Sequence, residues 1–316
     1  MNVKSLKLSQ LPTPINKLEI LSEELGQNLW IKRDDLTGFA FGGNKTRKLD
    51  LLIADALDRK YDTLVAVGAN QSNFCRIVAA YGSRYGLATH LVLGGMKPDN
   101  PTGNLRVAHI YGAIVHHYDT SDWERLEEKS RQLSKELFKQ GKKVYLLPIG
   151  GSTPLGSSGY IEAIKEIKDF ESENNISFDK LFVVAGSGGM QAGLIVGKVL
   201  YKWPGAIIGI SVSWAKPEQE KIIYSLAKEI AKIYHVEIDR KQIIIDDNYI
   251  GPGYGQSTPE AEAAIKLFAQ KEGIMLDSYY TGKGAAGLLD YIEQSKVSSQ
   301  ENILFLHSGG NIQLFE

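Results

Sequence analysis

A lysine at a glycine-rich turn is the side chain in this sequence with the clearest chemical potential. Lys45 closes the run GGNK at positions 42–45, and two further cations, Arg47 and Lys48, follow it closely. Nearby positive charge favours the neutral form of an amine, and a neutral amine attacks aldehydes. The run is not a P-loop, because Asn44 stands where that motif requires glycine. Most lysines are solvated surface charges, so the importance of Lys45 depends on what lies beside it.

A second glycine-rich segment, GSGG at positions 186–189, could bind a phosphate. It follows a predicted strand at 181–185 and opens a predicted helix at 190–200. Backbone N–H groups converge at consecutive glycines, and the N-terminus of a helix attracts an anion. A plain strand-to-helix turn is the alternative. A dinucleotide site is disfavoured, because the spacing is not G-x-G-x-x-G and the next predicted strand ends in SVS at 211–213, without an acid for a ribose.

A third turn, NQSN at positions 70–73, is polar throughout. It follows a predicted strand at 63–67, so its hydroxyl and amide groups could face a carboxylate or a ring oxygen. The same residue types also cap helices, and without further context that role is about as good an explanation.

Alternating strands and helices would position these turns. Runs rich in Val, Ile and Leu predict eight strands, most without polar alternation, as expected for strands buried on both faces. They are residues 63–67, 89–93, 114–117, 144–147, 180–185, 207–212, 243–245 and 302–306. Apolar residues at helical spacing predict helices at 45–60, 123–140 and 259–273. We therefore expect an α/β protein with mostly parallel sheets, flanked by helices, that bind ligands at the carboxyl ends of strands.

Composition narrows the class of protein. A chain of 316 residues favours two lobes around a cleft, and its 43% hydrophobic and 23% charged residues are typical of a soluble globular protein. A net charge of −1 gives little electrostatic support for nucleic-acid binding. Cys75 is the single cysteine, which suits a reducing compartment, and no apolar stretch is long enough for a bilayer. We expect a cytoplasmic protein without nucleic-acid or membrane partners and without a bound metal.

Several segments, in this order, resemble one enzyme family. They are LPTP at 11–14, IKRDDLT at 31–37, GGNKTRKL at 42–49, QSN at 71–73, GGS at 150–152, GPGYG at 251–255, YTGK at 280–283 and HSGG at 307–310. The sequence is similar to the 1-aminocyclopropane-1-carboxylate deaminase and D-cysteine desulfhydrase family, whose members depend on pyridoxal 5′-phosphate and have the two-domain tryptophan synthase β-like fold (fold type II). The resemblance implies a homodimer that acts on a small amino acid. In each chain, residues 1–46 and 160–316 would form a large cofactor-binding domain and residues 47–159 a small substrate-side domain.

The resemblance also implies roles for residues at matching positions around the cofactor. Lys45 would hold the cofactor through a covalent bond and would move the α-proton of the substrate. Asn73 would hydrogen-bond to the cofactor's 3′-oxygen, and Ser308 would face its pyridine nitrogen. The phosphate would be bound by the backbone N–H groups of Ser187, Gly188 and Gly189.

On the substrate side, the resemblance implies that Ser72 holds the substrate carboxylate. Tyr254 and Tyr280 would close this side of the site and take part in catalysis. The other residues expected to contact the substrate are Gln71, Asn73 and Thr281.

Some positions depart from the family pattern. Met190 stands where a threonine usually helps to bind phosphate, and Phe74 replaces the His of desulfhydrases or the Gln of deaminases. Gln191 resembles the deaminases, whereas Thr281 stands where deaminases carry a glutamate. A neutral hydroxyl such as that of Ser308 cannot keep the pyridine nitrogen protonated as a carboxylate can, which favours β-elimination over ring opening.

These observations predict a lyase that converts D-cysteine to pyruvate, sulfide and ammonia. Ring opening of 1-aminocyclopropane-1-carboxylate is one alternative. Elimination from D-serine, β-chloro-D-alanine or a sulfonate analogue is another, and Phe74 keeps it open. A catalytically silent relative that only binds a ligand or partner is also compatible with Met190 and Phe74, but the intact lysine, serine and tyrosines argue against it.

Overall fold

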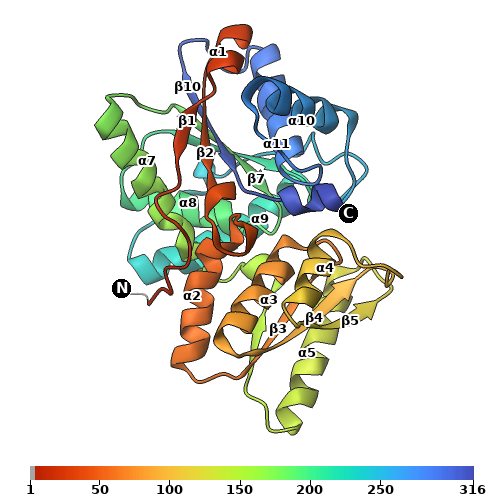
Figure 1. Ribbon diagram of the computed structural model, residues 1–316. Coiled ribbons are helices and arrows are strands. Elements are labelled where there is room, and N and C mark those ends of the chain that lie inside the picture. Colours follow the sequence, from red (N-terminus) through yellow and green to blue (C-terminus); the bar gives the residue numbers. More distant parts are fainter. Residues whose placement is uncertain (1–3) are drawn as a thin grey trace.

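The strands form two sheets, a small one from the middle of the chain and a large one from the segments before and after it (Figure 1). The computed structural model describes residues 4–316. The large lobe contains a six-stranded sheet in the order β1-β2-β10-β7-β8-β9, and the small lobe contains a four-stranded sheet in the order β5-β4-β3-β6. Every neighbouring pair is parallel except β1 and β2, which are antiparallel. The expected α/β architecture with mostly parallel sheets is confirmed.

All eight predicted strands are present, with ends that agree within two residues. The small sheet consists of β3 (Thr63–Ala69), β4 (Ala88–Gly94), β5 (Ile114–Tyr118) and β6 (Val144–Leu147). The large sheet consists of β1 (Ile15–Lys17), β2 (Asn28–Arg33), β7 (Lys180–Ala185), β8 (Ala206–Ser211), β9 (Ile244–Asp246) and β10 (Asn302–His307). The strands β1 and β2 are additional. β1 has three residues, and β2 mixes charged and apolar residues, so neither has the apolar run that marks the other strands.

Helices cover both sheets, and the four predicted helical segments are confirmed within two residues. The helices are α1 (Glu19–Leu25), α2 (Lys45–Asp58), α3 (Asn73–Tyr85), α4 (Gly103–Ile110), α5 (Trp123–Lys139), α6 (Pro154–Ser157), α7 (Ile161–Asn174), α8 (Gly189–Leu200), α9 (Lys216–Tyr234), α10 (Pro259–Glu272) and α11 (Thr281–Glu293). Short 3-10 turns connect several of them, and one such turn, η6 (Asn311–Phe315), ends the chain beside α4.

Burial on both faces explains why the strands lack polar alternation. In β7, Leu181 and Val183 pack into one apolar cluster with α7, α8 and α9, while Phe182 packs into a second cluster with α10 and α11. The small sheet follows the same rule, because Leu64 faces the cluster of α2 and α3 and Val65 faces α5. Successive side chains of a strand point to opposite faces, so each strand contributes to two cores.

The two sheets bring distant parts of the chain to one junction. The carboxyl ends of β3, β7 and β10 lie at this junction. The turns at 70–73 and 186–189 directly follow β3 and β7, and the third turn, at 42–45, reaches the junction from the segment between β2 and α2. The division into domains at residues 46/47 and 159/160 stays a prediction, and residues 1–3 of the large domain lie outside the described residues. Between residues 4 and 316, the structure has no helix that is both long and apolar enough to cross a membrane.

Candidate active site

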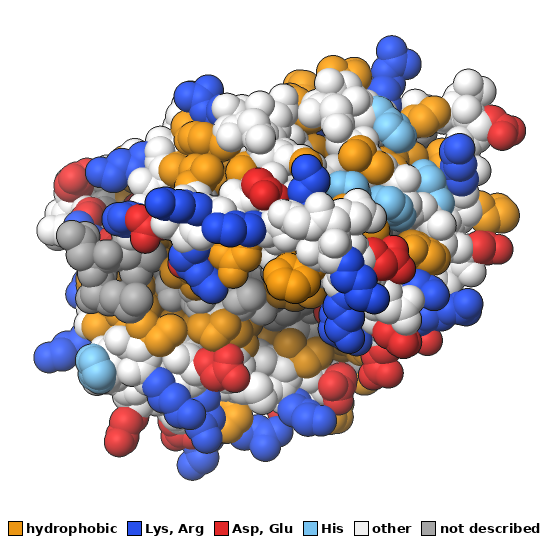
Figure 2. Space-filling view, turned by 90° about the horizontal axis from the view of Figure 1, so that it is seen from below, with side chains coloured by type: hydrophobic (Ala, Val, Ile, Leu, Met, Phe, Trp, Pro, Cys, Tyr) orange, Lys and Arg blue, Asp and Glu red, His pale blue; other side chains and the backbone are white. Residues whose placement is uncertain are grey.

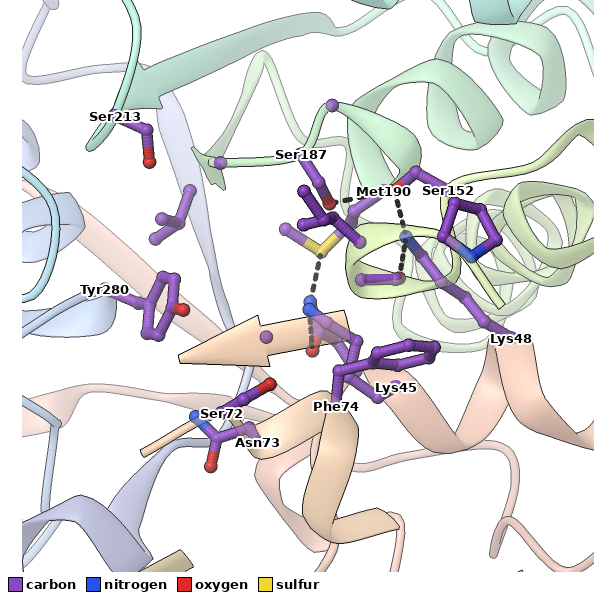
Figure 3. A pocket seen from close by; sticks show the side chains of 18 of the residues that line it. Lys45, Lys48, Ser72, Asn73, Phe74, Ser152, Ser187, Met190, Ser213 and Tyr280 are labelled. Atoms are coloured by element: carbon purple, nitrogen blue, oxygen red, sulfur yellow. Dashed lines mark hydrogen bonds between the residues drawn. The ribbon is translucent and has the colours of Figure 1, made fainter. Parts of the chain in front are cut away.

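A cavity of about 300 Å³ lies between the lobes. The small lobe contributes the end of β3 and the first turn of α3, and the large lobe contributes the segments after β7, β8 and β10. Its walls combine apolar surface with polar side chains from both lobes that could orient a small molecule. Figure 3 shows that side chains from both lobes converge on this space.

Lys45 lies at the start of α2 and lines the cavity. Its amine donates a hydrogen bond of 2.9 Å to Oδ1 of Asn44. Burial lowers the pKa of Lys45 to about 8, although the charge of Asp277 acts in the opposite direction. About a tenth of the amine is therefore neutral at pH 7, far more than for an ordinary lysine, and the neutral form is the one that attacks carbonyl carbon.

The neighbouring cations are not the main reason for this lowered pKa, contrary to the expectation from the sequence. Arg47 turns away from the cavity and forms buried ion pairs with Asp34 at 2.8 Å and Glu166 at 2.7 Å. Lys48 does line the cavity, where its amine donates to the carbonyl of Gly150 at 3.0 Å. The low-dielectric surroundings of the Lys45 amine, rather than repulsion from Arg47, account for most of the effect.

The segment after β7 forms an open cup at the N-terminus of α8. Gly188 precedes the helix with a φ of 78°, a conformation that favours glycine, and no side chain within the described residues caps this end. Ala192 donates the first backbone bond of the helix, to the carbonyl of Gly188, so the amides before it have no acceptor within the helix. Ser187 and Gly188 line the cavity, whereas Gly189 lies behind it.

Two further groups at this cup are not evident from the sequence. The hydroxyls of Ser152 and Ser187 lie 2.8 Å apart, and the amine of Lys48 lies 3.0 Å from the Ser152 hydroxyl. Burial and the charge of Lys45 hold the pKa of Lys48 well below its usual value. An amine, two hydroxyls and open backbone amides can all donate hydrogen bonds to an anion, so Lys48 and Ser152 complement the glycines.

Met190 lines the cavity at the first turn of α8, where its sulfur lies 3.8 Å from the side-chain nitrogen of Asn44 (Figure 3). Phe74 is buried and packs beneath the backbone of Gly151, where an added Cβ would lie 2.9 Å from its ring. The two departures from the family pattern are therefore apolar parts of the cavity wall.

The first turn of α3 contributes Ser72 and Asn73 to the cavity. The Ser72 hydroxyl caps the helix by accepting from the backbone N–H of Cys75 at 3.2 Å, and its own proton remains available to a ligand. Gln71 does not line the cavity. Its side chain instead accepts from the backbone N–H of Asn104 at 2.8 Å, which turns it away from the position expected for substrate binding.

Tyr254 and Tyr280 line the cavity with their hydroxyls hydrogen-bonded to each other. Burial raises the pKa of Tyr254 to about 12 and that of Tyr280 well above its usual value. Both phenols therefore stay protonated at neutral pH. The ring of Trp123, at the start of α5 in the small lobe, packs edge-on against Tyr254 at 5.3 Å and connects this pair to the opposite side of the cleft.

Thr281 and Ser308 occupy different surroundings, although the sequence suggests similar roles. Thr281 is fully buried outside the cavity, and its hydroxyl donates to the Asp277 carboxylate at 2.7 Å. Ser308 lines the cavity, and its backbone carbonyl accepts from the N–H of Asn44 at 2.9 Å. Thr281 thus does not lie where a substrate-contacting residue must, because the carboxylate beside it holds its hydroxyl away from the cavity.

Eight of the expected site residues come together at the cavity wall: Lys45, Ser72, Asn73, Ser187, Gly188, Tyr254, Tyr280 and Ser308. Gln71, Gly189 and Thr281 do not reach it. Figure 2 shows histidine side chains close together on one face of the molecule. However, in the part of the chain that is described, no three His, Cys, Asp or Glu side chains form a group that could hold a metal ion.

Comparison with known proteins gives one consistent result. A family described as "Pyridoxal-phosphate dependent enzyme" matches residues 6–309. The D-cysteine desulfhydrase of Klebsiella pneumoniae is 38% identical over 317 aligned residues, which cover 98% of this chain and 95% of that protein. The mitochondrial bifunctional D-cysteine desulfhydrase/1-aminocyclopropane-1-carboxylate deaminase of Arabidopsis thaliana is 35% identical, over 99% of this chain and 79% of its own length.

Solved structures agree with these relatives. The crystal structure of a homologue of 1-aminocyclopropane-1-carboxylate (ACC) deaminase superposes with a TM-score of 0.92 at 34% identity and covers 99% of this chain and 94% of its own. Threonine deaminase isoform 2 from Solanum lycopersicum superposes with a TM-score of 0.70 at 20% identity, over 97% of this chain and 82% of its own, which shows the shared fold.

Proposed function

The chain belongs to the family of pyridoxal-phosphate dependent enzymes, and on that basis we propose that it is a lyase that releases sulfide from D-cysteine. Its cofactor is pyridoxal 5′-phosphate. The observation that carries the proposal is the position of Lys45: a partly neutral amine on the wall of a cavity, between an open helix N-terminus and the polar first turn of α3. The choice of D-cysteine rests on the similarity to D-cysteine desulfhydrases over nearly the whole chain.

The cavity wall fits this cofactor. Lys45 would bond its aldehyde carbon, and Asn73 and Ser308 would face its ring oxygen and ring nitrogen. Its phosphate would lie in the cup formed by Ser187 and the amides at the start of α8, close to the Lys48 amine. When bound, the cofactor supplies an electron sink, while the protein supplies orientation and proton transfer.

The substrate would be held from the small lobe. The hydroxyl of Ser72 caps α3 through its lone pair and can donate its proton to the substrate carboxylate. The first turn of α3 also favours a negative charge, because its backbone dipoles point toward the cavity. The α-carbon would then lie within reach of Lys45, whose amine takes the α-proton.

The paired tyrosines would act on the leaving group. Because both remain protonated at neutral pH, they can donate a hydrogen bond to the sulfur as the Cβ–S bond breaks. The sulfur leaves as sulfide, and addition of water to the remaining fragment releases ammonia and pyruvate. Trp123 covers Tyr254 and limits the entry of water from that side.

Ring opening of 1-aminocyclopropane-1-carboxylate is the second candidate, supported by the 34% identical ACC deaminase homologue and by the bifunctional Arabidopsis relative. Its substrate has no α-proton for Lys45 to remove, and Ser308 offers a neutral partner to the ring nitrogen. We therefore expect kcat/KM for D-cysteine to exceed that for the cyclopropane substrate by about 100-fold, or about 2.7 kcal/mol.

The test measures keto-acid release from D-cysteine, L-cysteine, D-serine, 1-aminocyclopropane-1-carboxylate and cysteate by the purified protein. Predominant release from D-cysteine supports the proposal. Equal rates on D-cysteine and the cyclopropane substrate contradict it, and activity on D-serine or cysteate alone points to a different β-leaving group. A protein without a visible absorption band and without turnover would be a silent relative.

We further propose a homodimer with a cytoplasmic location and the two-domain division predicted from the sequence. Support for the dimer comes from the family resemblance and from large apolar side chains that are exposed in the single chain, among them Phe41, Ile110 and Phe315. The single cysteine supports a reducing compartment. The mass of the protein in solution, measured by light scattering, tests the dimer.

A further inference from the structure

Asn73 has a side chain with two different ends, a carbonyl oxygen that accepts hydrogen bonds and an NH2 group that donates them. The two ends have nearly the same shape, so contacts outside the cavity must decide which one faces inward. Under the proposed function, Asn73 serves an anionic ring oxygen, and only its NH2 group can do so. The groups behind Asn73 are therefore part of the site's chemistry.

Asn104, at the start of α4, makes the decisive contact. It is 1% exposed, and its side-chain nitrogen donates to the backbone carbonyl of Gln71 at 3.0 Å and to Oδ1 of Asn73 at 3.1 Å. Its backbone N–H donates to Oε1 of Gln71 at 2.8 Å, which fixes the position of the residue. Asn104 is thus attached to the loop that carries Asn73 at three points.

The orientation of this chain of amides follows from the backbone. The carbonyl of Gln71 can only accept, so the side-chain end of Asn104 that contacts it must be the nitrogen. That nitrogen also contacts Asn73, so the end of Asn73 that meets it must be the oxygen. The NH2 group of Asn73 is then left to face the cavity. Figure 3 agrees with this, because the Asn73 nitrogen lies on the side of Ser72 and Tyr280 and the oxygen points away from them.

Arg76, one turn further along α3, acts in the same direction. Its guanidinium can only donate, and Nη2 lies 3.5 Å from Oδ1 of Asn73. The residue is 1% exposed, and its other bonds go to the carbonyls of Ala40 and Gly42, in the turn before Lys45. Burial lowers its pKa to about 10, so it remains charged at neutral pH.

We propose that Asn104, assisted by Arg76, is a positioning residue that holds the amide of Asn73 with its NH2 group toward the cofactor's ring oxygen. This rests on the proposed function, because it requires Asn73 to contact that oxygen. Asn104 itself lies outside the cavity wall and touches neither cofactor nor substrate. A residue of α4, more than 30 residues along the chain from Asn73, would thus contribute to the site without contacting its ligands.

The consequence can be measured as the pH midpoint of the visible band of the holoenzyme. A donor on the ring oxygen stabilises its anionic form and lowers its basicity, so the adjacent Lys45 nitrogen loses its proton at lower pH. Loss of the donor should raise the midpoint by about one pH unit, the worth of one hydrogen bond. Asp277 also acts on the charge of Lys45, and Lys45 acts on that of Lys48, and both of these neighbours stay in place in every variant below.

The sharpest variant is Asn104→Asp, because a carboxylate can only accept. It would draw the NH2 group of Asn73 toward itself and turn the oxygen into the cavity. The matched control is Asn100→Asp, which adds the same charge at an exposed position four residues away. Asn104→Ala, Asn73→Ala and the double variant Asn73→Ala/Asn104→Asp complete the set, with far-UV circular dichroism to confirm folding.

We expect the midpoint to rise by about one unit in Asn73→Ala and at least as much in Asn104→Asp, and to stay within about 0.2 units of wild type in Asn100→Asp. When Asn73 is already alanine, the further change Asn104→Asp should shift the pH midpoint by no more than Asn100→Asp shifts it in the wild-type protein. If Asn104→Asp or Asn104→Ala behaves like the control while Asn73→Ala shifts the midpoint, the positioning role is wrong and the proposed function stands. If Asn73→Ala leaves the midpoint unchanged, the premise is wrong and so is the inference. The Asn104→Ala variant gives the same decision should Asn104→Asp fail to fold.

Discussion

Two helix N-termini face the same cavity from opposite lobes, and they are built in opposite ways. Ser72 is the N-cap of α3, and its hydroxyl accepts from the backbone N–H of Cys75. α8 begins after Gly188, without any capping side chain in the described structure. Both ends carry the same partial positive charge. At α3 a side chain accepts from one of the helix amides and further side chains are presented to the ligand, whereas α8 presents the amides themselves.

This difference separates the two tasks of the site. An open, glycine-lined terminus suits a phosphate, because several N–H groups can converge on one anion without side chains in the way. A capped terminus keeps its helix stable without a ligand and leaves Ser72 and Asn73 to contact smaller groups. We therefore expect substitutions at α8 to act mainly on cofactor affinity and substitutions at α3 mainly on substrate handling.

Gly189→Ala should have the largest effect and should weaken cofactor binding. A Cβ at this position would lie 2.5 Å from the Ser152 hydroxyl and 2.7 Å from that of Ser157, and would collide with the Lys48 amine. Overpacking of this kind costs about 2 kcal/mol, or about thirtyfold in the Kd of pyridoxal phosphate. Equilibrium titration of the apoprotein measures it.

Gly186→Ala is the matched control for that variant. It lies in the same turn, and a Cβ there would have its nearest neighbours at 3.9 Å. We expect a change in Kd of less than about threefold, which corresponds to less than about 0.7 kcal/mol. If both alanine variants changed the Kd of pyridoxal phosphate equally, the close packing around Gly189 would not matter for cofactor binding. The phosphate would then not lie in the cup at the start of α8.

Ser72→Ala should act on the other terminus and on a different quantity. Removal of the hydroxyl takes one hydrogen bond from the substrate carboxylate, which should raise KM for D-cysteine about tenfold. It also removes the cap of α3 and should lower the free energy of unfolding by about 1 kcal/mol. Ser187→Ala at α8 should weaken cofactor binding and leave the KM at saturating cofactor near its wild-type value. The comparison between the lobes breaks down if the two serine variants change the same parameter.

The smallest expected effect concerns pH and the amine that lies between the two termini. Burial lowers the pKa of Lys45 to about 8, so the neutral fraction grows as the pH rises toward that value. Attachment of the cofactor to the apoprotein requires the neutral amine, and its rate should increase about fivefold between pH 7 and pH 8 and level off above about pH 9. Stopped-flow absorbance follows the attachment directly. A rate that does not change between pH 7 and pH 9 would show that the amine is already neutral at pH 7 and would contradict this expectation.

The fold could be read from the sequence because most strands are buried on both faces. Each then appears as an apolar run, and all eight such runs are strands. β2 escapes this rule because it carries Lys32 and Arg33 among apolar residues. The structure explains this composition, since the Lys32 amine is buried in an ion pair with Glu166 at 2.6 Å. From local hydrophobicity alone, a buried lysine whose partner is far along the chain cannot be distinguished from an exposed one.

The site was predictable where motifs place residues at strand ends, and less so where side-chain direction matters. Lys45, Ser72 and Ser308 all line the cavity. Gln71 and Thr281 are next to residues that line it, but hydrogen bonds to Asn104 and Asp277 turn them elsewhere. Adjacency in sequence does not fix where a side chain points.

Lys48 and Asn104 show a second limit. Lys48 lies one turn after Lys45, so its approach to the cup follows from helical spacing, but its partners Gly150 and Ser152 are about 100 residues away. Asn104 lies outside all the segments that resemble the family. Its contact with Asn73 exists only because α4 packs against α3 in the folded chain.

The covalent attachment point of the cofactor tests the account most directly, because two lysines, Lys45 and Lys48, line the same wall. The holoenzyme is reduced with borohydride and digested, and the modified lysine is identified by mass spectrometry. The visible band should disappear on reduction, the pyridoxyl group should be found on Lys45, and Lys45→Ala should fold, bind the cofactor without a covalent bond and lose turnover. Modification of Lys48, or wild-type turnover by Lys45→Ala, would contradict the account.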